Sequence, residues 1–220
     1  MLISFEQLKS VLPELEFGGM RVLHVGACKL EELPLYQKAG ISDIVWIEAR
    51  KDEVQEMRRR HPDQKILCAC VSNVTGQPVT FETHKNVMCS SALRITDLKR
   101  RVYKATVVKA EPMTTITLTD LLARYKIERP FQMLNVDIQG SELAALQGFP
   151  EKLWPEVQIV YVELNRQALY AGSFTEAEMD AFMATKGLYR ACERWCHLFG
   201  DAAYVRGRAP GQPSHVFPPA

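Results

Sequence analysis

The stretch "RVLHVGACKLEE", residues 21–32, decides the fold of this chain. Residues 22–25 are an apolar run that predicts a buried strand, and Gly26 ends this strand at a turn into a helix. Nucleotide-binding folds place a glycine loop at such a turn, but a loop for a dinucleotide needs three glycines. Because this turn has a single glycine, it argues against a site that binds a pyrophosphate.

The rest of the chain repeats this unit of a short strand followed by a helix. Apolar runs predict strands at residues 22–25, 43–47, 65–71, 131–136, 157–164, 188–192 and 202–205. Strands that alternate with helices favour a parallel sheet with helices on both faces, and two final strands joined only by a loop favour an antiparallel hairpin. The sequence therefore predicts a Rossmann-like α/β fold with a mostly parallel seven-stranded sheet and a C-terminal antiparallel hairpin.

The length of 220 residues suits one domain, which we expect over residues 1–206. Residues 1–19 would form an N-terminal helical extension, and residues 73–113 interrupt the regular alternation as an insertion. Residues 207–220 contain four prolines and two glycines, which predicts an irregular tail.

The composition is that of an ordinary globular protein, with 47% hydrophobic and 24% charged residues. A net charge of +1 argues against a nucleic-acid or membrane partner. The N-terminus lacks the pattern of a signal peptide, and no apolar run reaches the ~18 residues of a membrane span. We therefore expect a cytoplasmic protein whose six cysteines stay reduced, and their spacings predict no metal site.

Ligands in open parallel sheets bind at the carboxyl ends of the strands. The residues that follow the first five predicted strands include Gly26, Ala27, Glu48, Val71, Ser72, Asp137, Gln139, Glu163 and Asn165. Glu48 follows Gly26 by 22 residues. This is close to the ~20 residues that separate a glycine turn from a ribose-binding acid. We therefore predict that Glu48 accepts hydrogen bonds from two ribose hydroxyls.

A cofactor without phosphates fits this pattern better than a dinucleotide. S-adenosylmethionine needs one tight turn, an acid for its ribose, an apolar slot for adenine and polar groups for its amino-acid end. Gly26 would let the backbone pass close to this ligand, where a side chain would obstruct it. An NAD-dependent oxidoreductase would share the sheet and the ribose acid, but the missing glycines count against it.

Residues 134–149, "LNVDIQGSELAALQGF", resemble the FkbM family of S-adenosylmethionine-dependent methyltransferases. The family pattern is a strand, an aspartate, Glu or Gln, Gly, a small residue, Glu-Leu and a helix that ends in Leu-x-Gly. Asp137, Gln139, Gly140, Glu142, Leu143 and Gly148 fit it in order. Further resemblances at "HVGACKLEELPLY", "VWIEA", "SSAL", "TTITLTDLL", "YVELNRQALYAG" and "FGDAAYVR" extend over about residues 20–206.

The resemblance implies a class I methyltransferase that methylates a hydroxyl oxygen on a sugar, a polyketide or another small metabolite. It implies cofactor contacts at Gly26, Ala27, Cys28, Glu48, Ala49, Val71, Ser72 and Asp137, and acceptor contacts at Ser90, Ser91, Gln139, Glu163 and Asn165. Residues 73–113 would then be the acceptor side of the domain. The expected partners are the small-molecule acceptor and, in a homodimer, a second copy of the chain.

A hydroxyl acceptor benefits from a group that takes its proton. Asp137 is the first candidate for this base, Glu163 the second and His84 the third. Asp137 has an alternative role in positioning the cofactor. In a metal-assisted alternative, Asp137 and Glu163 would be ligands, since hard cations favour carboxylate oxygens.

Leu30 departs from the family pattern, which usually has glycine or another small residue at this position. A leucine that narrows the cofactor pocket would favour a cofactor-binding protein without methyl transfer. A leucine that points into the core would leave the pocket open, and we expect this outcome because the flanking motifs are intact.

Overall fold

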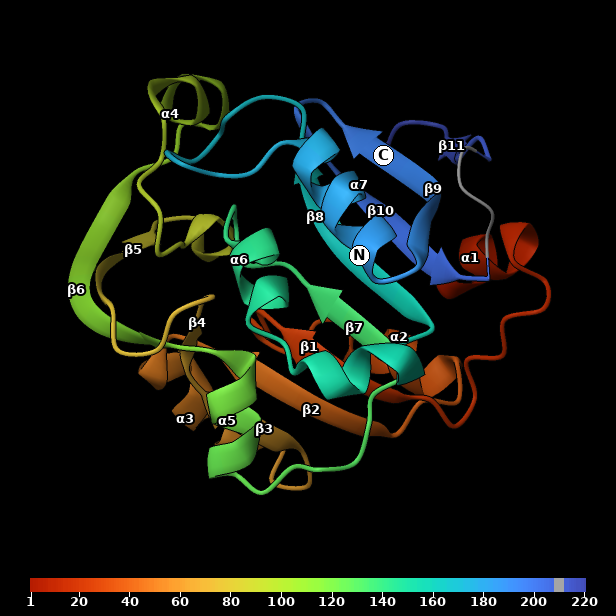
Figure 1. The fold of residues 1–220 in the computed structure, drawn as a ribbon. Coiled ribbons are helices and arrows are strands. Elements are labelled where there is room, and N and C mark those ends of the chain that lie inside the picture. Colours follow the sequence, from red (N-terminus) through yellow and green to blue (C-terminus); the bar gives the residue numbers. More distant parts are fainter. Residues whose placement is uncertain (208–211) are drawn as a thin grey trace.

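An eight-stranded sheet runs through the protein in the order β11-β9-β10-β8-β7-β1-β2-β3 (Figure 1). The computed structural model describes residues 1–207 and 212–220. The strands are β1 (Arg21–Val25), β2 (Asp43–Glu48), β3 (Lys65–Cys68), β7 (Met133–Val136), β8 (Ile159–Asn165), β9 (Leu188–Cys196), β10 (Phe199–Arg206) and β11 (His215–Phe217). Strands β3, β2, β1, β7 and β8 pair in parallel, whereas β10 pairs antiparallel with β8 and β9. The predicted α/β fold with a terminal antiparallel hairpin is thus confirmed.

Strand β11 was not predicted from the sequence. It pairs in parallel with β9, with His215 opposite Cys192, so the prediction of an irregular tail is wrong for this segment. Phe217 explains the difference, because its side chain is buried in the core on one side of the sheet, and that burial holds the strand in place. Residues 208–211 of the predicted tail lie outside the described residues.

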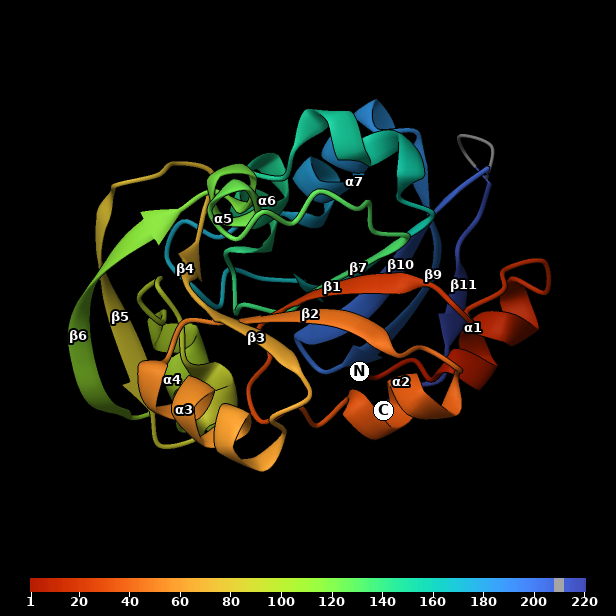
Figure 2. The ribbon, with the colours of Figure 1, turned by 90° about the horizontal axis from the view of Figure 1, so that it is seen from below.

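Helices cover both faces of the sheet (Figure 2). One face carries α1 (Phe5–Val11), α2 (Leu33–Lys38) and α3 (Lys51–Arg60); the other carries α5 (Leu118–Arg124), α6 (Glu142–Gln147), the 3-10 helix η2 (Glu151–Glu156) and α7 (Glu176–Thr185). The alternation of side chains along a strand feeds the two cores. In β2, Trp46 packs with α1–α3, and its neighbours Val45 and Ile47 pack on the opposite side.

The insertion between β3 and α5 builds a second sheet in the order β4-β6-β5. Its elements are β4 (Cys70–Val71), β5 (Pro78–His84), the 3-10 helix η1 (Val87–Cys89), α4 (Asp97–Tyr103) and β6 (Val107–Ile116). Strands β5 and β6 pair antiparallel, and β4 pairs in parallel with the end of β6. This layer stands at one end of the main sheet (Figure 2), so it can face ligands that bind at the strand ends.

A buried polar cluster lies under the first turn of the fold. The hydroxyl of Tyr36 accepts a hydrogen bond from Nδ2 of Asn135 over 2.7 Å and lies 3.0 Å from Nδ1 of His24. Burial lowers the pKa of His24 to about 4, so its ring is neutral at pH 7 and Nδ1 can accept a hydrogen bond from the Tyr36 hydroxyl. The three side chains tie β1, β7 and α2 together beneath the ligand-facing edge of the sheet.

Leu30 points into the core, as predicted. Its side chain is 3% exposed and packs with the α1–α3 side of the sheet. Its φ of +60° lies in the left-handed region, as does that of Cys28 at +46°. Glycine adopts this backbone conformation at the lowest cost, which explains why a glycine suits this position of the turn.

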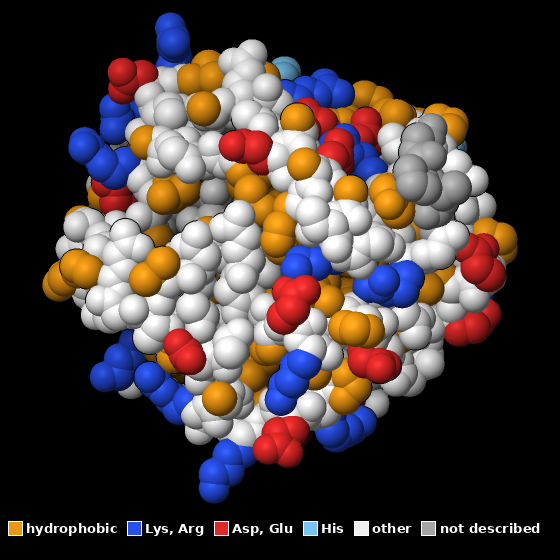
Figure 3. Space-filling model, viewed as in Figure 1, with side chains coloured by type: hydrophobic (Ala, Val, Ile, Leu, Met, Phe, Trp, Pro, Cys, Tyr) orange, Lys and Arg blue, Asp and Glu red, His pale blue; other side chains and the backbone are white. Residues whose placement is uncertain are grey.

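Charged side chains of both signs are interspersed over the face shown in Figure 3, as the net charge of +1 predicts. Within the described part of the chain, every helix is too short or too polar to cross a bilayer.

Candidate functional site

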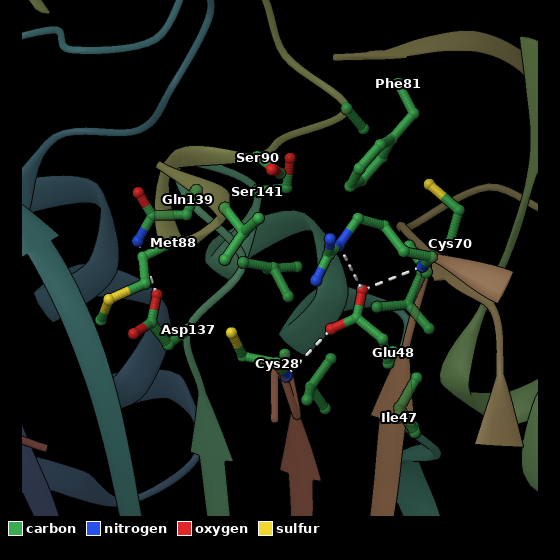
Figure 4. A pocket seen from close by; sticks show the side chains of 18 of the residues that line it. Cys28, Ile47, Glu48, Cys70, Phe81, Met88, Ser90, Asp137, Gln139 and Ser141 are labelled. Atoms are coloured by element: carbon green, nitrogen blue, oxygen red, sulfur yellow. Dashed lines mark hydrogen bonds and ion pairs between the residues drawn. The ribbon is translucent and has the colours of Figure 1, made fainter. Parts of the chain in front are cut away.

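A cavity opens at the carboxyl ends of β1, β2 and β7, where the insertion faces the sheet (Figure 4). It holds about 820 Å³ of empty space, including its open mouth. The main sheet contributes Gly26, Cys28, Glu48, Ala49, Arg50, Asp137 and Gln139 to its lining, and β4 and the insertion contribute Cys70, Val71, Phe81, Met88 and Ser90. The cavity therefore lies at the edge where the sequence analysis placed the ligand.

Glu48 ends β2 with its carboxylate at the cavity wall. Oε2 accepts the backbone N–H of Cys28 over 3.0 Å, and Oε1 accepts that of Arg50 over 2.9 Å. Burial raises the pKa of Glu48, and the N–H and the charge of Arg50 oppose this rise. Because an ionised carboxylate offers about four lone-pair sites, each oxygen can accept one more hydrogen bond from a ligand.

Gly26 is required first by the packing of the protein itself. Its φ is +98°, and a Cβ at this position would lie 1.8 Å from the carbonyl oxygen of Asp137. The N–H groups of Gly26 and Ala27 both donate to the carbonyl of Ile47 over 2.9 Å. The close approach that the sequence analysis assigned to the ligand is therefore an approach between the turn after β1 and the end of β7.

Apolar side chains form one wall of the cavity. Ile47, Ala69, Val71 and Phe81 line it, and Phe81 is only 7% exposed although it comes from the insertion. The guanidinium of Arg50 lies beside this wall, 3.7 Å from Oε1 of Glu48 and 3.1 Å from Glu53. Such a wall suits a flat, apolar ring next to a hydroxylated group held by Glu48.

Phe81 and Arg50 line the cavity but were not predicted as site residues. The position of Phe81 depends on how β5 folds back, which the strand–helix alternation does not encode. Arg50 could have been found, because it follows Glu48 by two residues and a basic group beside a buried acid is a common pairing.

Asp137 follows β7, is half-buried and lines the side of the cavity opposite Glu48 (Figure 4). Nε2 of Gln139 donates to Oδ1 of Asp137 over 2.8 Å and to Oε2 of Glu163 over 2.9 Å. Burial and the charge of Asp201 raise the pKa of Asp137 to about 6. At pH 7 this carboxylate is mostly ionised, yet it binds a proton more tightly than an ordinary aspartate.

Asp137 belongs to a cluster of three acids. Carboxylate oxygens of Asp137, Glu142 and Glu163 lie within 4.8 Å of one another. Glu142 is fully buried and accepts the N–H groups of Ile138 and Gly140. Burial, with the charge of Asp137, raises the pKa of Glu142 to about 7 and that of Glu163 well above its usual range. Since the Gln139 amide bridges two of the acids, hydrogen bonds hold this cluster together.

Several predicted site residues do not line the cavity. Among the predicted contacts, Ala27, His84, Ser91, Glu163 and Asn165 are buried away from it, and Ser72 lines a neighbouring cavity. Ser91 has a structural role, because its hydroxyl donates to the carbonyl of Gln139 over 2.8 Å. Glu163 lies behind the lining, where it accepts a hydrogen bond from Gln139 over 2.9 Å and neighbours Asp137.

His84 does not have the geometry of a base. Its side chain is fully buried in β5, and the nearest carboxylate oxygen, on Glu82, is 3.8 Å from Nε2. Burial lowers the pKa of His84. His84 is not placed to act as a base, because both of its ring nitrogens are buried within β5 and its side chain does not line the cavity.

Comparisons with known proteins agree with this fold. Residues 24–192 match the model of the methyltransferase FkbM domain. The FkbM methyltransferase of Methylobacillus flagellatus KT superposes with a TM-score of 0.57 and 13% identity, over 92% of this chain and 46% of that one. The magnesium protoporphyrin IX methyltransferase ChlM of Synechocystis PCC 6803 with bound SAH superposes with a TM-score of 0.50 and 9% identity, over 92% and 81%.

No curated protein matches the chain. At identities this low the solved structures establish the shared fold, and this chain spans less than half of the Methylobacillus protein.

Proposed function

We propose, since the chain belongs to the FkbM methyltransferase family, that it transfers a methyl group from S-adenosylmethionine to a hydroxyl oxygen of a small-molecule acceptor. One observation carries the choice of a hydroxyl. Asp137 lines the cavity with a carboxylate whose pKa is raised to about 6, so it can take up the proton that a hydroxyl loses.

The lining residues fit S-adenosylmethionine. Each oxygen of Glu48 keeps room for one ribose hydroxyl, and the wall with Val71 and Phe81 suits the adenine ring. The Cys28 N–H donates to Glu48 and so does not face the cavity as a phosphate-binding group, which suits a cofactor without phosphates. Bound there, S-adenosylmethionine would supply an electrophilic methyl group on a positively charged sulfur, and this sulfur can leave as a neutral thioether.

The protein's own contribution is alignment and proton removal. Glu48 lies on one side of the cavity and Asp137 on the other, and the turn after β1 contacts both of them. Holding two reactants in line removes a large part of the entropic barrier to displacement. Asp137 accepts the hydroxyl proton on one oxygen while Gln139 donates to Oδ1, so the carboxylate keeps a defined orientation.

The loop around η1 supports a small acceptor with both polar and apolar parts. Met88 is 57% exposed at the cavity, and Val87 lies beside it. The Ser90 hydroxyl accepts the backbone N–H of His84 over 3.2 Å, which leaves its own proton free to donate to an acceptor. We propose that this loop holds the acceptor against Asp137.

Calorimetry tests the cofactor first. We expect S-adenosylmethionine to bind and NAD to give no heat, because the turn after β1 has one glycine where a pyrophosphate-binding loop has three. Absence of binding by S-adenosylmethionine would contradict the proposal.

A labelled methyl donor tests the acceptor chemistry. The protein is incubated with methyl-¹³C S-adenosylmethionine and a panel of hydroxylated and aminated small molecules. We expect the label in the methoxy region of the carbon spectrum, and Asp137→Asn should remove most of it. Label only on nitrogen, or full turnover by the Asn variant, would overturn the proposed hydroxyl chemistry.

A further inference from the structure

We infer that Lys99, on α4 of the insertion, is a positioning residue for Asp137: with Tyr170 it fixes the Gln139 amide that holds the Asp137 carboxylate. This inference rests on the proposed role of Asp137 as the base. Three features support it: the lysine is buried, two hydrogen-bond donors share one amide oxygen, and hydrogen bonds of the backbone hold α4 in place.

Lys99 is a buried cation, 4% exposed. Its Nζ donates to Oε1 of Gln139 over 3.0 Å and also to the hydroxyl of Tyr170, whose ring centroid is 3.7 Å away. It forms no ion pair within 4 Å with an acid among the described residues. Burial of an ammonium group costs free energy unless the group is well paired, and the usual partner is a carboxylate. The Lys99 ammonium instead faces an amide oxygen, and this arrangement needs an explanation.

The reason lies at the other end of the amide. Oε1 of Gln139 accepts from both Lys99 and Tyr170, so its NH₂ group must face the other way. There it donates one N–H to Asp137 and one to Glu163. A cation on the oxygen polarises the amide and strengthens both N–H donors, because hydrogen bonds in a chain reinforce one another. Lys99 thereby stabilises the ionised form of Asp137 without touching it.

The backbone holds Lys99 in this position. The N-cap residue of α4, Thr96, donates its hydroxyl to the carbonyl of Ala168 over 2.8 Å, and the N–H of Ala171 donates to the carbonyl of Arg94 over 2.8 Å. Residues 94–96 are thus paired with residues 168–171, directly before α4. The insertion is fastened to the segment that carries Tyr170.

Gly140 makes room for the Tyr170 ring. A Cβ on Gly140 would lie 2.9 Å from three atoms of the Tyr170 side chain, and the φ of Gly140 is +101°. Gln139, directly before it, has a φ of +59°. The Gln-Gly pair therefore serves this contact: glutamine supplies the amide, and glycine lets the tyrosine reach it.

Removal of Lys99 should make Asp137 harder to ionise. Without the cation, the amide donates less strongly to Asp137 and Glu163, and the cluster gains net negative charge. The titratable groups that interact with Asp137 are Glu32, Glu142, Glu163, Asp201, Lys99, Cys89, Tyr170 and the N-terminal amino group. Since four of these are carboxylic acids, loss of the cation should raise the pKa of Asp137 by about one unit.

Carboxyl ¹³C NMR measures this directly in the protein without an acceptor. The Asp137 resonance is assigned by its loss in Asp137→Asn and titrated in the wild type, Lys99→Met, Lys99→Arg and Arg101→Met. Arg101 is an exposed cation on the same helix and serves as the matched control. We expect an upward shift in Lys99→Met, a wild-type value in Arg101→Met and a near-wild-type value in Lys99→Arg.

A double-mutant cycle with Gln139→Met tests the route. If Lys99 acts through the amide, Lys99→Met should shift the Asp137 titration by less than half as much in the Gln139→Met background. An equal shift in both backgrounds, or none in the wild-type background, overturns the inference. Tyr170→Phe, which removes one donor and keeps the ring, should give a smaller shift of the same sign. If Lys99→Met does not fold, Tyr170→Phe takes its place in the double-mutant cycle.

The experiments distinguish a failure of this inference from a failure of the proposed function. A protein that shows the coupled titration but methylates no hydroxyl would contradict the proposed function alone. An active methyltransferase whose Asp137 titration ignores Lys99 would contradict this inference alone.

Discussion

The backbone N–H of Cys28 donates to Oε2 of Glu48 over 3.0 Å, so the turn after β1 and the acid that ends β2 act as one unit. In a phosphate-binding loop, a free N–H at this place would face the ligand. Here the Cys28 N–H donates to the Glu48 carboxylate, and this hydrogen bond orients the carboxylate towards the cavity. The relationship explains physically why one glycine suffices in this turn.

Glu48→Gln should weaken the binding of S-adenosylmethionine by roughly 10- to 100-fold, the value of one or two hydrogen bonds to a charged group. The amide offers a single acceptor oxygen, so one of the two backbone N–H groups would face its NH₂. Isothermal calorimetry measures the change. Glu56→Gln, at a partly exposed position of α3 that does not line the cavity, is the control and should bind like the wild type. An unchanged affinity in Glu48→Gln would rule out the ribose role.

Gly26→Ala should cost at least ~3 kcal/mol of the free energy of unfolding, because it combines left-handed backbone strain with a collision against the Asp137 carbonyl. Gly76→Ala is a matched control: its φ is +89°, but nothing lies within 4 Å of its Cβ position. It should cost only about 1 kcal/mol. Urea unfolding of both variants checks this, and equal costs would show that the collision is relieved by a shift of the chain.

Asp137→Asn should stabilise the protein at pH 8 by about 1–2 kcal/mol while it removes the base. The pKa of Asp137 rises from 3.8 to about 6 on folding, chiefly through burial. The folded state therefore binds this proton more tightly than the unfolded state does. This proton binding contributes its whole stabilisation below pH 3.8, and the contribution is lost as the pH rises through about 6. Asparagine cannot ionise and escapes this loss.

Urea unfolding of the wild type and Asp137→Asn between pH 4 and 8 tests the sign. The gap between them should shrink as the pH falls. A variant less stable than the wild type at pH 8 would show that ionised Asp137 is favourably paired in the folded protein.

Tyr36→Phe should destabilise the fold by about 1–3 kcal/mol at pH 7, because Asn135 and His24 lose a buried partner. The packing of the ring against Trp46 stays, so the loss isolates the hydroxyl. Thermal or urea unfolding measures it. A neutral result would mean that the remaining contact of 3.3 Å between Asn135 and His24 tightens enough to replace the tyrosine.

Leu30→Gly should lower stability by about 2–3 kcal/mol, since the lost burial outweighs the relief of left-handed strain. The affinity for S-adenosylmethionine should stay within about twofold, because Leu30 does not line the cavity. Cys28→Gly, at a φ of +46° in the same turn, removes strain with less burial lost and should stay within about 1 kcal/mol of the wild type. A large gain in cofactor affinity by Leu30→Gly would indicate that the leucine restricts the pocket in solution.

The local pattern was enough to predict the main sheet and part of the site. Runs such as residues 22–25 and 43–47 are read directly as buried strands, and Gly26, Glu48 and Asp137 follow strand ends that all meet at one edge. Ser90 and Gln139 at the cavity were also found through the family pattern. Strand β11 was missed because His215 pairs with Cys192, far away in the sequence, and the three residues of the strand carry little signal of their own.

By itself, the sequence determined the parallel sheet, its terminal hairpin and the acids at its edge, because strand and helix periodicity and residue order are local properties. Tertiary structure decided which of those residues share a cavity. The fold of the insertion put Phe81 into the wall and took His84 out of reach, and it brought Lys99 to Gln139 across 40 residues. Such contacts depend on how separate segments pack in space, and no spacing along the chain records that.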